Sequence, residues 1–461
     1  MDLSKVKKIY MIGIKGVGMT MLAQYFCGQG IEVMGSDIEE KFMTDKVLDS
    51  LGIKVFEHFD ENNIARDADL IVYSTAYNAE RNIEVAKALT GKIRTLTYAE
   101  AMGEVFNQKF GIAVCGSHGK TTTTAWLGYV LSEAGEDPSV MVGSYVPQFK
   151  GASLIGKSDY LVIEADEYQN KLKSFSPKAV LLNNIDYDHP DFFKTPEDYE
   201  DVFIQFIQKI TKKGFLVAYF DDPIIVKFAR VNCKGRVIGY SIENKDADIL
   251  AYDLRHETGS QFFKVKLKDD EGYSELGEFK IKLSGLHNIY NALAVIAASI
   301  ELGVELKDIR GALGEFAGTA RRMQVMGEFR GATVVDDYAH HPTEIKATLS
   351  GARQLYGGKK IIAVFHPHTF TRTKTLLDDF AQSFKDADEI VILDIYGSAR
   401  EAQGGVHSKD LIDKIKGQEV KYVPTLDEVE KYLREHIERN DVILLMGAGD
   451  VFRVGERLVK M

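Results

Sequence analysis

The sequence predicts an α/β protein with three domains, each built around a mostly parallel sheet. The chain has 461 residues, and at roughly 150 residues per domain this length suits three. Short apolar runs alternate with helical patterns along much of the chain, which indicates parallel strands joined by crossover helices. A glycine-rich loop between a strand and a helix occurs twice, at residues 13–18 and 116–119.

Residues 1–106 are predicted to form a Rossmann-like domain. Residues 8–14, 31–35 and 70–74 are short apolar runs typical of buried parallel strands, and residues 19–30 have a helical pattern. The order strand, glycine loop, helix at the start is the order with which such domains begin.

Residues 107–320 are predicted to form a P-loop ATPase-like domain. Its first strand, at residues 111–115, leads through the second glycine loop into a helix at residues 121–134. From residue 237 to 283 polar and apolar residues alternate between polar turns, which indicates a small antiparallel sheet at the domain edge. The other elements predicted here are buried strands at residues 160–163 and 179–182 and a helix at residues 287–303.

Residues 321–461 are predicted to form a second Rossmann-like domain. Both domain boundaries are predicted to within roughly ten residues. Helices alternate with five predicted strands, at residues 332–335, 360–365, 389–393, 420–423 and 441–446.

The composition is that of an acidic globular protein. There are 57 Lys and Arg against 68 Asp and Glu, for a formal net charge of −11, and without a long basic run no binding to nucleic acid is expected. The three cysteines are too few and too scattered for a disulfide framework or a zinc motif. No apolar run approaches the roughly 20 residues that span a bilayer, and the start lacks a signal-peptide core. We therefore expect a cytoplasmic protein that does not enter a membrane.

The first glycine loop leaves three interpretations open. Gly13, Gly16 and Gly18 precede the helix, and Asp37 follows at about the 20-residue distance of a ribose-contacting acid. Lys15 replaces the second glycine of the dinucleotide fingerprint, which disfavours an NAD-dependent oxidoreductase. A diphosphate at the helix N-terminus is favoured, and a tight turn without a ligand is the third interpretation.

The second glycine loop is the stronger signal and predicts ATP binding. Its backbone N–H groups can cradle phosphates, Lys120 can reach the β and γ oxygens, and the Thr121 hydroxyl can ligate Mg²⁺. A chance turn and a non-enzymatic P-loop binding protein are the alternatives. The residues predicted to hold ATP in this loop are Gly116, Ser117, His118, Gly119, Lys120, Thr121 and Thr122.

Acidic segments follow two predicted strands of the central domain. Glu164 is the first residue beyond the strand at residues 160–163, and residues 186–191 combine three aspartates with His189. Ligands bind at the carboxyl ends of parallel strands, and Mg²⁺ prefers oxygen ligands. We predict Glu164 as a magnesium ligand and a metal-linked or phosphate-linked role for His189. A solvated acidic loop is the alternative.

Polar groups also gather around and beyond the second boundary. The amides of Asn288 and Asn291 could face an adenine or only the neighbouring backbone, and Arg322 could reach a phosphate or belong to a solvated basic pair. Residues 336–344 and 366–373 follow successive strands, so they can define one pocket with two histidines and an arginine. A guanidinium in such a pocket suits recognition of a carboxylate.

In combination these segments resemble the Mur ligases, and among them the branch that adds L-alanine to UDP-N-acetylmuramate. The resemblance covers all three predicted domains. Residues 13–16 and 394–401 further resemble the Gram-positive-like branch. The segments that carry the resemblance are, in order, residues 116–122, 164–168, 184–191, 287–291, 321–322, 336–344 and 366–373.

The resemblance implies that ATP and Mg²⁺ convert the lactyl carboxylate of UDP-N-acetylmuramate to an acyl phosphate, which the alanine amine attacks. It implies one Mg²⁺ on Thr121 and Glu164 and a second on His189. Further ATP contacts would come from Asn288, Asn291, Arg322 and Asp336. The UDP part would lie on Gly16, Gly18, Asp37, Ser74 and Thr75. The amino acid would lie among Tyr338, His340, His341, His368 and Arg372, with His341, or else His340, near the amine. Catalytic roles would fall to Lys120, His189, His341 and Arg372.

Two features bear on the substrate. Thr369 stands where many alanine-adding Mur ligases have an arginine, which leaves Arg372 as the main carboxylate clamp. Residues 198–207 contain no lysine, whereas Mur ligases that add later residues use a carbamylated lysine there. The nearest rival is the ligase that joins an intact tripeptide to UDP-N-acetylmuramate. Preference among alanine, glycine and serine is left open, as are the oligomeric state and the number of metal ions.

Overall fold

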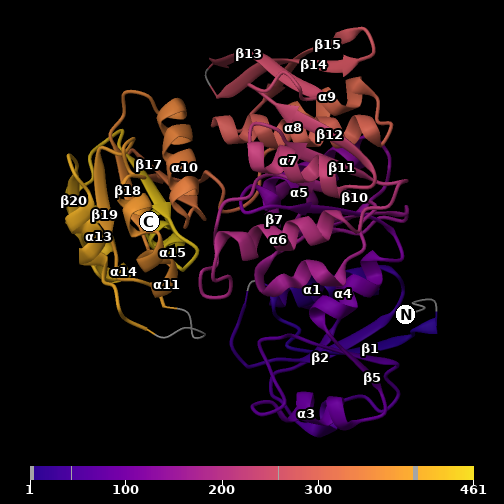
Figure 1. Cartoon of the computed structure of the whole chain (residues 1–461). Helices are drawn as coiled ribbons and strands as arrows, with labels where there is room; N and C mark the ends of the chain where they lie inside the picture. Colours follow the sequence, from indigo (N-terminus) through magenta and orange to yellow (C-terminus); the bar gives the residue numbers. More distant parts are fainter. Residues whose placement is uncertain (1–4, 43, 258, 398–402, 461) are drawn as a thin grey trace.

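Three sheets follow one another along the chain in the computed structural model, which describes residues 5–42, 44–257, 259–397 and 403–460. In Figure 1 the N-terminal sheet lies at the bottom, the central sheet above it and the C-terminal sheet to the left. The predicted three-part α/β architecture is confirmed. The domain boundaries near residues 106 and 321 fall between the sheets and stay predictions.

The N-terminal sheet is parallel, with the strand order β3-β2-β1-β4-β5. The order reverses at β1, so the first glycine loop lies at the switch point where doubly wound sheets bind ligands. The strands are β1 (Lys8–Ile12), β2 (Glu32–Ser36), β3 (Lys54–Phe56), β4 (Leu70–Tyr73) and β5 (Arg94–Thr97), and the helices are α1 (Val17–Gly28), α2 (Asp45–Ser50), α3 (Ile83–Thr90) and α4 (Tyr98–Phe106).

The central sheet has ten strands in the order β15-β14-β13-β12-β11-β10-β6-β9-β7-β8. β6 lies between β9 and β10 and is parallel to both, so the loops after these three strands meet at one edge. The strands are β6 (Phe110–Cys115), β7 (Ser139–Val146), β8 (Gly151–Leu154), β9 (Tyr160–Glu164), β10 (Ala179–Leu182), β11 (Phe215–Tyr219), β12 (Arg236–Ser241), β13 (Ile249–Glu257), β14 (Ser260–Asp269) and β15 (Gly272–Ile281).

The predicted antiparallel edge is confirmed, because β13, β14 and β15 pair antiparallel at one end of this sheet, at the top of Figure 1. The helices of the central part are α5 (Lys120–Glu133), α6 (Pro196–Ile207), α7 (Pro223–Asn232), α8 (Leu286–Glu301) and α9 (Leu306–Glu315), with a 3₁₀ segment η4 (Tyr168–Ser174).

The C-terminal sheet has the order β16-β17-β21-β18-β19-β20 and is parallel except for β16. The strands are β16 (Gln324–Phe329), β17 (Ala332–Asp337), β18 (Ile361–Phe365), β19 (Glu389–Ile392), β20 (Glu419–Tyr422) and β21 (Val442–Met446). The helices are α10 (Pro342–Leu355), α11 (Phe370–Thr375), α12 (Leu377–Ala381), α13 (Ser408–Lys414), α14 (Leu426–His436) and α15 (Phe452–Val459). In Figure 1, α10 faces the central part.

The N-terminal and central parts share one hydrophobic core. A single cluster of buried residues runs from Ile9 and Leu22 through Phe106 to Phe203. At Gly28 in α1 a Cβ atom would lie 2.4 Å from the Ile155 side chain, so a larger residue would push the two parts away from each other. The two faces of the C-terminal sheet have separate cores. Among the described residues, no helix combines the length and apolar character needed to cross a membrane.

Candidate active site

The second glycine loop joins β6 to α5 and requires glycine at two positions. Gly116 and Gly119 have φ angles of +124° and +77°, which L-residues rarely adopt. A Cβ atom on Gly119 would also lie 2.6 Å from Asn291 Oδ1. The loop therefore passes directly against α8, and its backbone lies open to a phosphate at the N-terminus of α5.

Lys120 lies at the centre of this loop. Its Nζ donates hydrogen bonds to the carbonyls of Gly116 and Ser117, at 2.6 and 3.0 Å, and to Glu167 Oε2 at 2.9 Å. Burial by itself would lower the pKa of Lys120, but the charges of Glu167 and Asp166 outweigh it and raise that pKa. The side chain is therefore a cation at neutral pH, held against the carbonyls of the phosphate loop.

The two residues predicted to hold magnesium are in contact. Thr121 Oγ1 donates to Glu164 Oε1 at 2.8 Å, and Glu164 Oε2 accepts from the backbone N–H of Gly143 at 2.7 Å. A hydroxyl and a carboxylate beside the phosphate loop form the oxygen donor set that Mg²⁺ takes in such sites. These residues therefore fit the ion.

His189 lies beside a second group of carboxylates. Its Nε2 is 3.7 Å from Glu167 Oε1, and donor atoms of His189, Glu167 and Asp166 lie within 4.8 Å of one another. Burial lowers the pKa of His189, so its imidazole is neutral at pH 7 and able to ligate a cation. His189 also has a φ of +58°, an unusual backbone conformation for a side chain of this size.

A cavity of about 710 Å³ opens between the phosphate loop, α8 and α10. Asn183 Oδ1, Ser284 Oγ and Thr319 Oγ1, on residues lining it, are buried without a hydrogen-bond partner among the described residues. Buried polar atoms are ordinarily paired, so these atoms fit a polar ligand such as a nucleotide. Of the residues predicted to bind ATP, the cavity wall includes His118, Gly119, Thr122, Asn288, Asn291 and Arg322.

Asn288 and Asn291 bond to each other, whereas Arg321 and Arg322 have different partners. Asn288 donates to the Ser284 carbonyl at 2.7 Å and accepts from Asn291. Arg321 Nε donates to Asp336 Oδ2 at 3.0 Å. Arg322 instead lies on the cavity wall, over the Tyr338 ring. Asp336 is buried against Arg321 and is not on that wall, where its neighbour Asp337 lies.

His118 connects the phosphate loop to the C-terminal part. Its Nε2 lies 2.9 Å from Asp186 and its Nδ1 lies 3.2 Å from Glu344 in α10. Burial opposes protonation, but the two carboxylates raise the pKa of His118 to about 9. His341 lies beside it, with ring centroids 4.8 Å apart, and burial together with the His118 charge lowers the pKa of His341. The two histidines therefore differ in charge at pH 7.

Four of the five residues predicted to hold the amino acid are in contact with one another at the end of the C-terminal sheet, whereas His341 contacts the central part. The His340 ring contacts those of Tyr338 and His368, with centroids 5.2 and 6.3 Å away. Arg372 follows in α11, and its Nη1 lies 3.4 Å from the His368 carbonyl. The Arg372 guanidinium also bonds with two of its nitrogens to Asp188 of the central part. The Arg372 guanidinium and the neutral imidazole of His341 thus lie along the same interface between the central and C-terminal parts.

The first glycine loop is built differently from the prediction. The Lys15 side chain does not stand in the loop: it is buried, and its Nζ donates to the carbonyls of Ile38 and Glu40. The Lys15 side chain therefore gives no steric reason against a ligand on this loop. Asp37 accepts from Lys15 N, Ile38 N and Tyr77 OH, and so braces the loop.

The remaining residues predicted to bind UDP lie on the open side of this loop. Gly16 is the N-cap of α1 and is exposed, and Gly18 lies against Tyr98, whose ring a Cβ would meet at 2.8 Å. Ser74 is half-buried and Thr75 is exposed at the carboxyl end of β4, the neighbour of β1. The helix N-terminus therefore remains accessible to a diphosphate.

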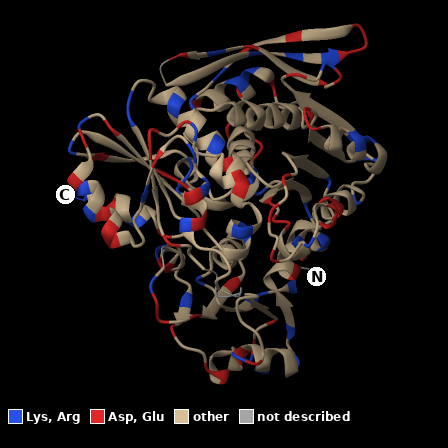
Figure 2. Ribbon diagram, turned by 60° about the vertical axis from the view of Figure 1, so that its left-hand side comes forward, with Lys and Arg blue, Asp and Glu red and all other residues tan. Residues whose placement is uncertain are grey.

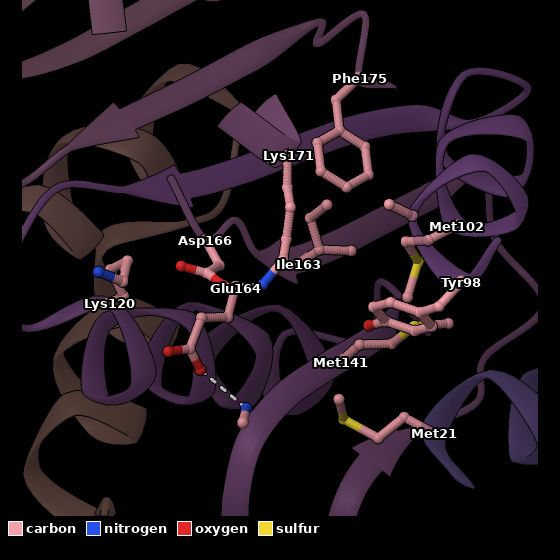
Figure 3. Close-up of a pocket in the computed structure, with 12 residues that line it drawn as sticks. Met21, Tyr98, Met102, Lys120, Met141, Ile163, Glu164, Asp166, Lys171 and Phe175 are labelled. Carbon is pink, nitrogen blue, oxygen red and sulfur yellow. Dashed lines mark hydrogen bonds and ion pairs between the residues drawn. The ribbon is translucent and has the colours of Figure 1, made fainter. Parts of the chain in front are cut away.

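A smaller cavity of about 270 Å³ lies between the N-terminal and central parts. Figure 3 shows Met21, Tyr98 and Met102 on one side and Lys120 and Glu164 on the other. The cavity thus connects apolar side chains of α1 and α4 to the phosphate loop.

The chain belongs to the Mur ligase family. Residues 8–110 match the model of the Mur ligase family catalytic domain, residues 114–299 that of the Mur ligase middle domain, and residues 321–449 that of the Mur ligase glutamate ligase domain. Two curated relatives are both named UDP-N-acetylmuramate–L-alanine ligase. The one from Desulfitobacterium hafniense is 40% identical over 98% of this chain and 99% of its own length. The one from Caldanaerobacter subterraneus is 40% identical over 100% and 98%.

Solved structures agree with this assignment. The UDP-N-acetylmuramate–alanine ligase of Thermotoga maritima is 28% identical, with a TM-score of 0.80 over 98% of both chains. A murein peptide ligase from Psychrobacter arcticus is 25% identical, with a TM-score of 0.73 over 98% of both chains.

Sequence analysis missed the carboxylates that pair with the predicted cations, namely Glu167, Asp188 and Glu344. The signal available was their position within the acidic and histidine-rich segments, but no spacing rule assigns a partner so far away in the sequence. The segment predicted to indicate the Gram-positive-like branch is described only as far as Gly397; residues 398–401 lie outside the described residues.

Proposed function

We propose that this Mur ligase joins L-alanine to the lactyl carboxylate of UDP-N-acetylmuramate, with conversion of ATP to ADP and phosphate. The observation that carries the proposal is the shared interface: Lys120 with Thr121 and Glu164 lies on one side, and His341 with Arg372 on the other, joined through His118. Full-length relatives that bear this activity in their names support the same reaction. A cytoplasmic location is part of the proposal.

In the first half-reaction a lactyl carboxylate oxygen attacks the γ phosphorus, the bond to the bridging oxygen of ADP breaks, and an acyl phosphate forms. Lys120 stabilises the negative charge that spreads over the transferring group. Mg²⁺, held by Thr121 and Glu164 and at a second position by His189, would neutralise phosphate charge when bound. The remaining phosphate loop residues, Asn288, Asn291 and Arg322 hold the nucleotide in the larger cavity, and Asp336 holds the neighbouring Arg321.

In the second half-reaction the amine nitrogen attacks the carbonyl carbon of the acyl phosphate and phosphate leaves. His341 is neutral at pH 7, and its Nδ1 takes the proton that the amine loses, in place of the hydrogen bond that Nδ1 accepts from the Thr343 N–H. Arg372 and His368 bind the carboxylate of the incoming amino acid. Tyr338 and His340 limit the space around the side chain of that amino acid. A carboxylate is a poor electrophile, so activation must precede this step.

The UDP end lies on the N-terminal sheet, with its diphosphate at the exposed start of α1 near Gly16 and Gly18. Ser74 and Thr75 contact it from the neighbouring strand end, and Asp37 holds the loop in shape. The smaller cavity receives the muramoyl end, because it leads from α1 and α4 directly to Lys120. Its apolar wall suits the lactyl methyl group.

The test is ADP release by the purified protein in the presence of UDP-N-acetylmuramate, ATP and Mg²⁺. We expect turnover only when an amino acid is added, and faster turnover with L-alanine than with serine, glycine or the L-alanine-containing tripeptide. Turnover with the tripeptide and none with alanine would mean that the recycling ligase is the right assignment. Reduction of NAD in place of ADP release would indicate an oxidoreductase.

A further inference from the structure

We infer that Asp188 is a positioning residue that orients Arg372 for the carboxylate of the incoming amino acid. The inference rests on the proposed function, in which Arg372 is the carboxylate clamp. Asp188 follows β10 in the central part and Arg372 lies in α11 of the C-terminal part, so the clamp is assembled from two domains.

The contact is a two-point ion pair. Arg372 Nε donates to Asp188 Oδ1 at 2.8 Å, and Arg372 Nη2 donates to Asp188 Oδ2 at 3.2 Å. The two side chains are only 5% and 7% exposed. A two-point contact of this kind fixes the plane of the guanidinium as well as its position, and burial keeps water from competing.

The pairing with Asp188 uses only part of the guanidinium. A guanidinium has five N–H groups, and Asp188 uses one on Nε and one on Nη2. Among the described residues, the remaining contact is Nη1 with the His368 carbonyl at 3.4 Å, a long hydrogen bond. The N–H groups on the edge formed by Nη1 and Nη2 can therefore donate to a second carboxylate. That edge lies on the side of His368, which the proposed function also assigns to the amino acid.

Asp188 also makes alanine binding depend on domain docking. Without the central part, Arg372 would lose the group that sets its orientation, although its own helix would be intact. The residue next to Asp188 is His189, so the same loop serves the phosphoryl-transfer site. The His189 backbone N–H donates to Asp188 Oδ1 at 2.7 Å, a contact that an asparagine oxygen at position 188 can still accept.

The first experiment measures steady-state kinetics of Asp188→Asn in the full-length protein. We expect KM for alanine to rise roughly tenfold or more, because a charge-assisted contact to the clamp is lost. KM for ATP and for UDP-N-acetylmuramate should change by less than about threefold, since neither contacts Arg372. Gln354→Ala is the matched control: it removes a different contact between the two parts, to Gly285 and Gln261, and should leave KM for alanine unchanged.

A second measurement separates orientation of the clamp from general loosening. Alaninamide lacks the carboxylate, so the ratio of kcat/KM for alanine over alaninamide reports the interaction with Arg372. If the amide gives no turnover, its inhibition constant replaces that value. Asp188→Asn should lower the ratio towards that of Arg372→Lys, and the double variant should be no worse than Arg372→Lys alone.

The outcomes are distinct. An unchanged alanine KM and an unchanged ratio in folded Asp188→Asn would overturn the inference while leaving the proposed function intact. Failure of the unmodified protein to use alanine would overturn the proposed function itself. If Asp188→Asn does not fold, Asp188→Glu keeps the buried charge but displaces the guanidinium, and the same rise in alanine KM is expected. Wild-type kinetics in Asp188→Glu would then count against the inference.

Discussion

Lys120, Arg372 and His118 are each bound to a carboxylate from a distant part of the chain. Their partners are Glu167, Asp188 and Glu344, at sequence separations of 47, 184 and 226 residues. Burying a charge is costly unless an opposite charge accompanies it. The motifs predicted the cations because each has local chemistry, but the counter-charges depend on which loops the fold brings together.

Replacing Lys120 tests whether phosphoryl transfer and UDP-N-acetylmuramate binding take place at separate sites. Lys120→Ala should lower kcat at least about a hundredfold, because the charge that stabilises phosphoryl transfer is lost. UDP-N-acetylmuramate binding, measured by calorimetry, should persist, since that ligand lies mainly on the N-terminal sheet. Lys194→Ala, at an exposed position in the loop after β10, is the control with unchanged kcat. Loss of UDP-N-acetylmuramate binding in Lys120→Ala would contradict the proposed arrangement.

At the scale of elements, several buried parallel strands were predictable, whereas the edge strands β3 and β16 were not. β1, β9, β10 and β18 are continuous apolar runs with both faces covered, which is the pattern such strands leave in a sequence. β3 has only three residues, none of them fully buried, and β16 is an antiparallel edge. Neither leaves a periodic signal, because tertiary pairing stabilises them.

The start of α5 gives a prediction that isolates one contact. Gly119 and Gly135 both have positive φ angles, but nothing lies within 4 Å of a Cβ on Gly135. Both alanine variants should lose roughly 1–2 kcal/mol of stability from the backbone conformation. Only Gly119→Ala should also raise KM for ATP, because its methyl group displaces Asn291 from the cavity wall. Thermal unfolding and ATP kinetics check the two effects, and equal ATP kinetics in both variants would contradict the role of Asn291.

At the scale of the whole molecule, the C-terminal part docks on the central part through ionisable groups, whereas the N-terminal part docks through apolar ones. Asp186, His118 and Glu344 lie at the first interface, and a shared core fills the second. The net charge of −11 does not create a surface of one sign: Figure 2 shows acidic and basic residues interspersed over all three parts. Phosphate binding therefore depends on local cations and helix ends.

The interface at His118 predicts a pH dependence of stability. Because the folded pKa is raised from 6.5 to about 9, the stabilisation is complete below about pH 6.5 and is lost as the pH rises through 9. It amounts to at most about 3 kcal/mol. Unfolding followed at pH 6.5 and pH 9 should show a smaller difference in His118→Gln than in the unmodified protein. An equal difference in both would show that His118 does not stabilise the interface.

The sequence by itself determined the three-part α/β architecture, the phosphate loop and most of the residues proposed to contact ligands, because these depend on local patterns of glycine, apolar residues and charge. Only the tertiary structure decided that Lys15 turns away from its loop, that Arg321 pairs with Asp336 while Arg322 faces the cavity, and that Asp188 holds Arg372. Each of those outcomes depends on which groups the fold buries next to one another. A buried charge pairs with the opposite charge that is nearest in space, and spacing along the chain does not show which one that is.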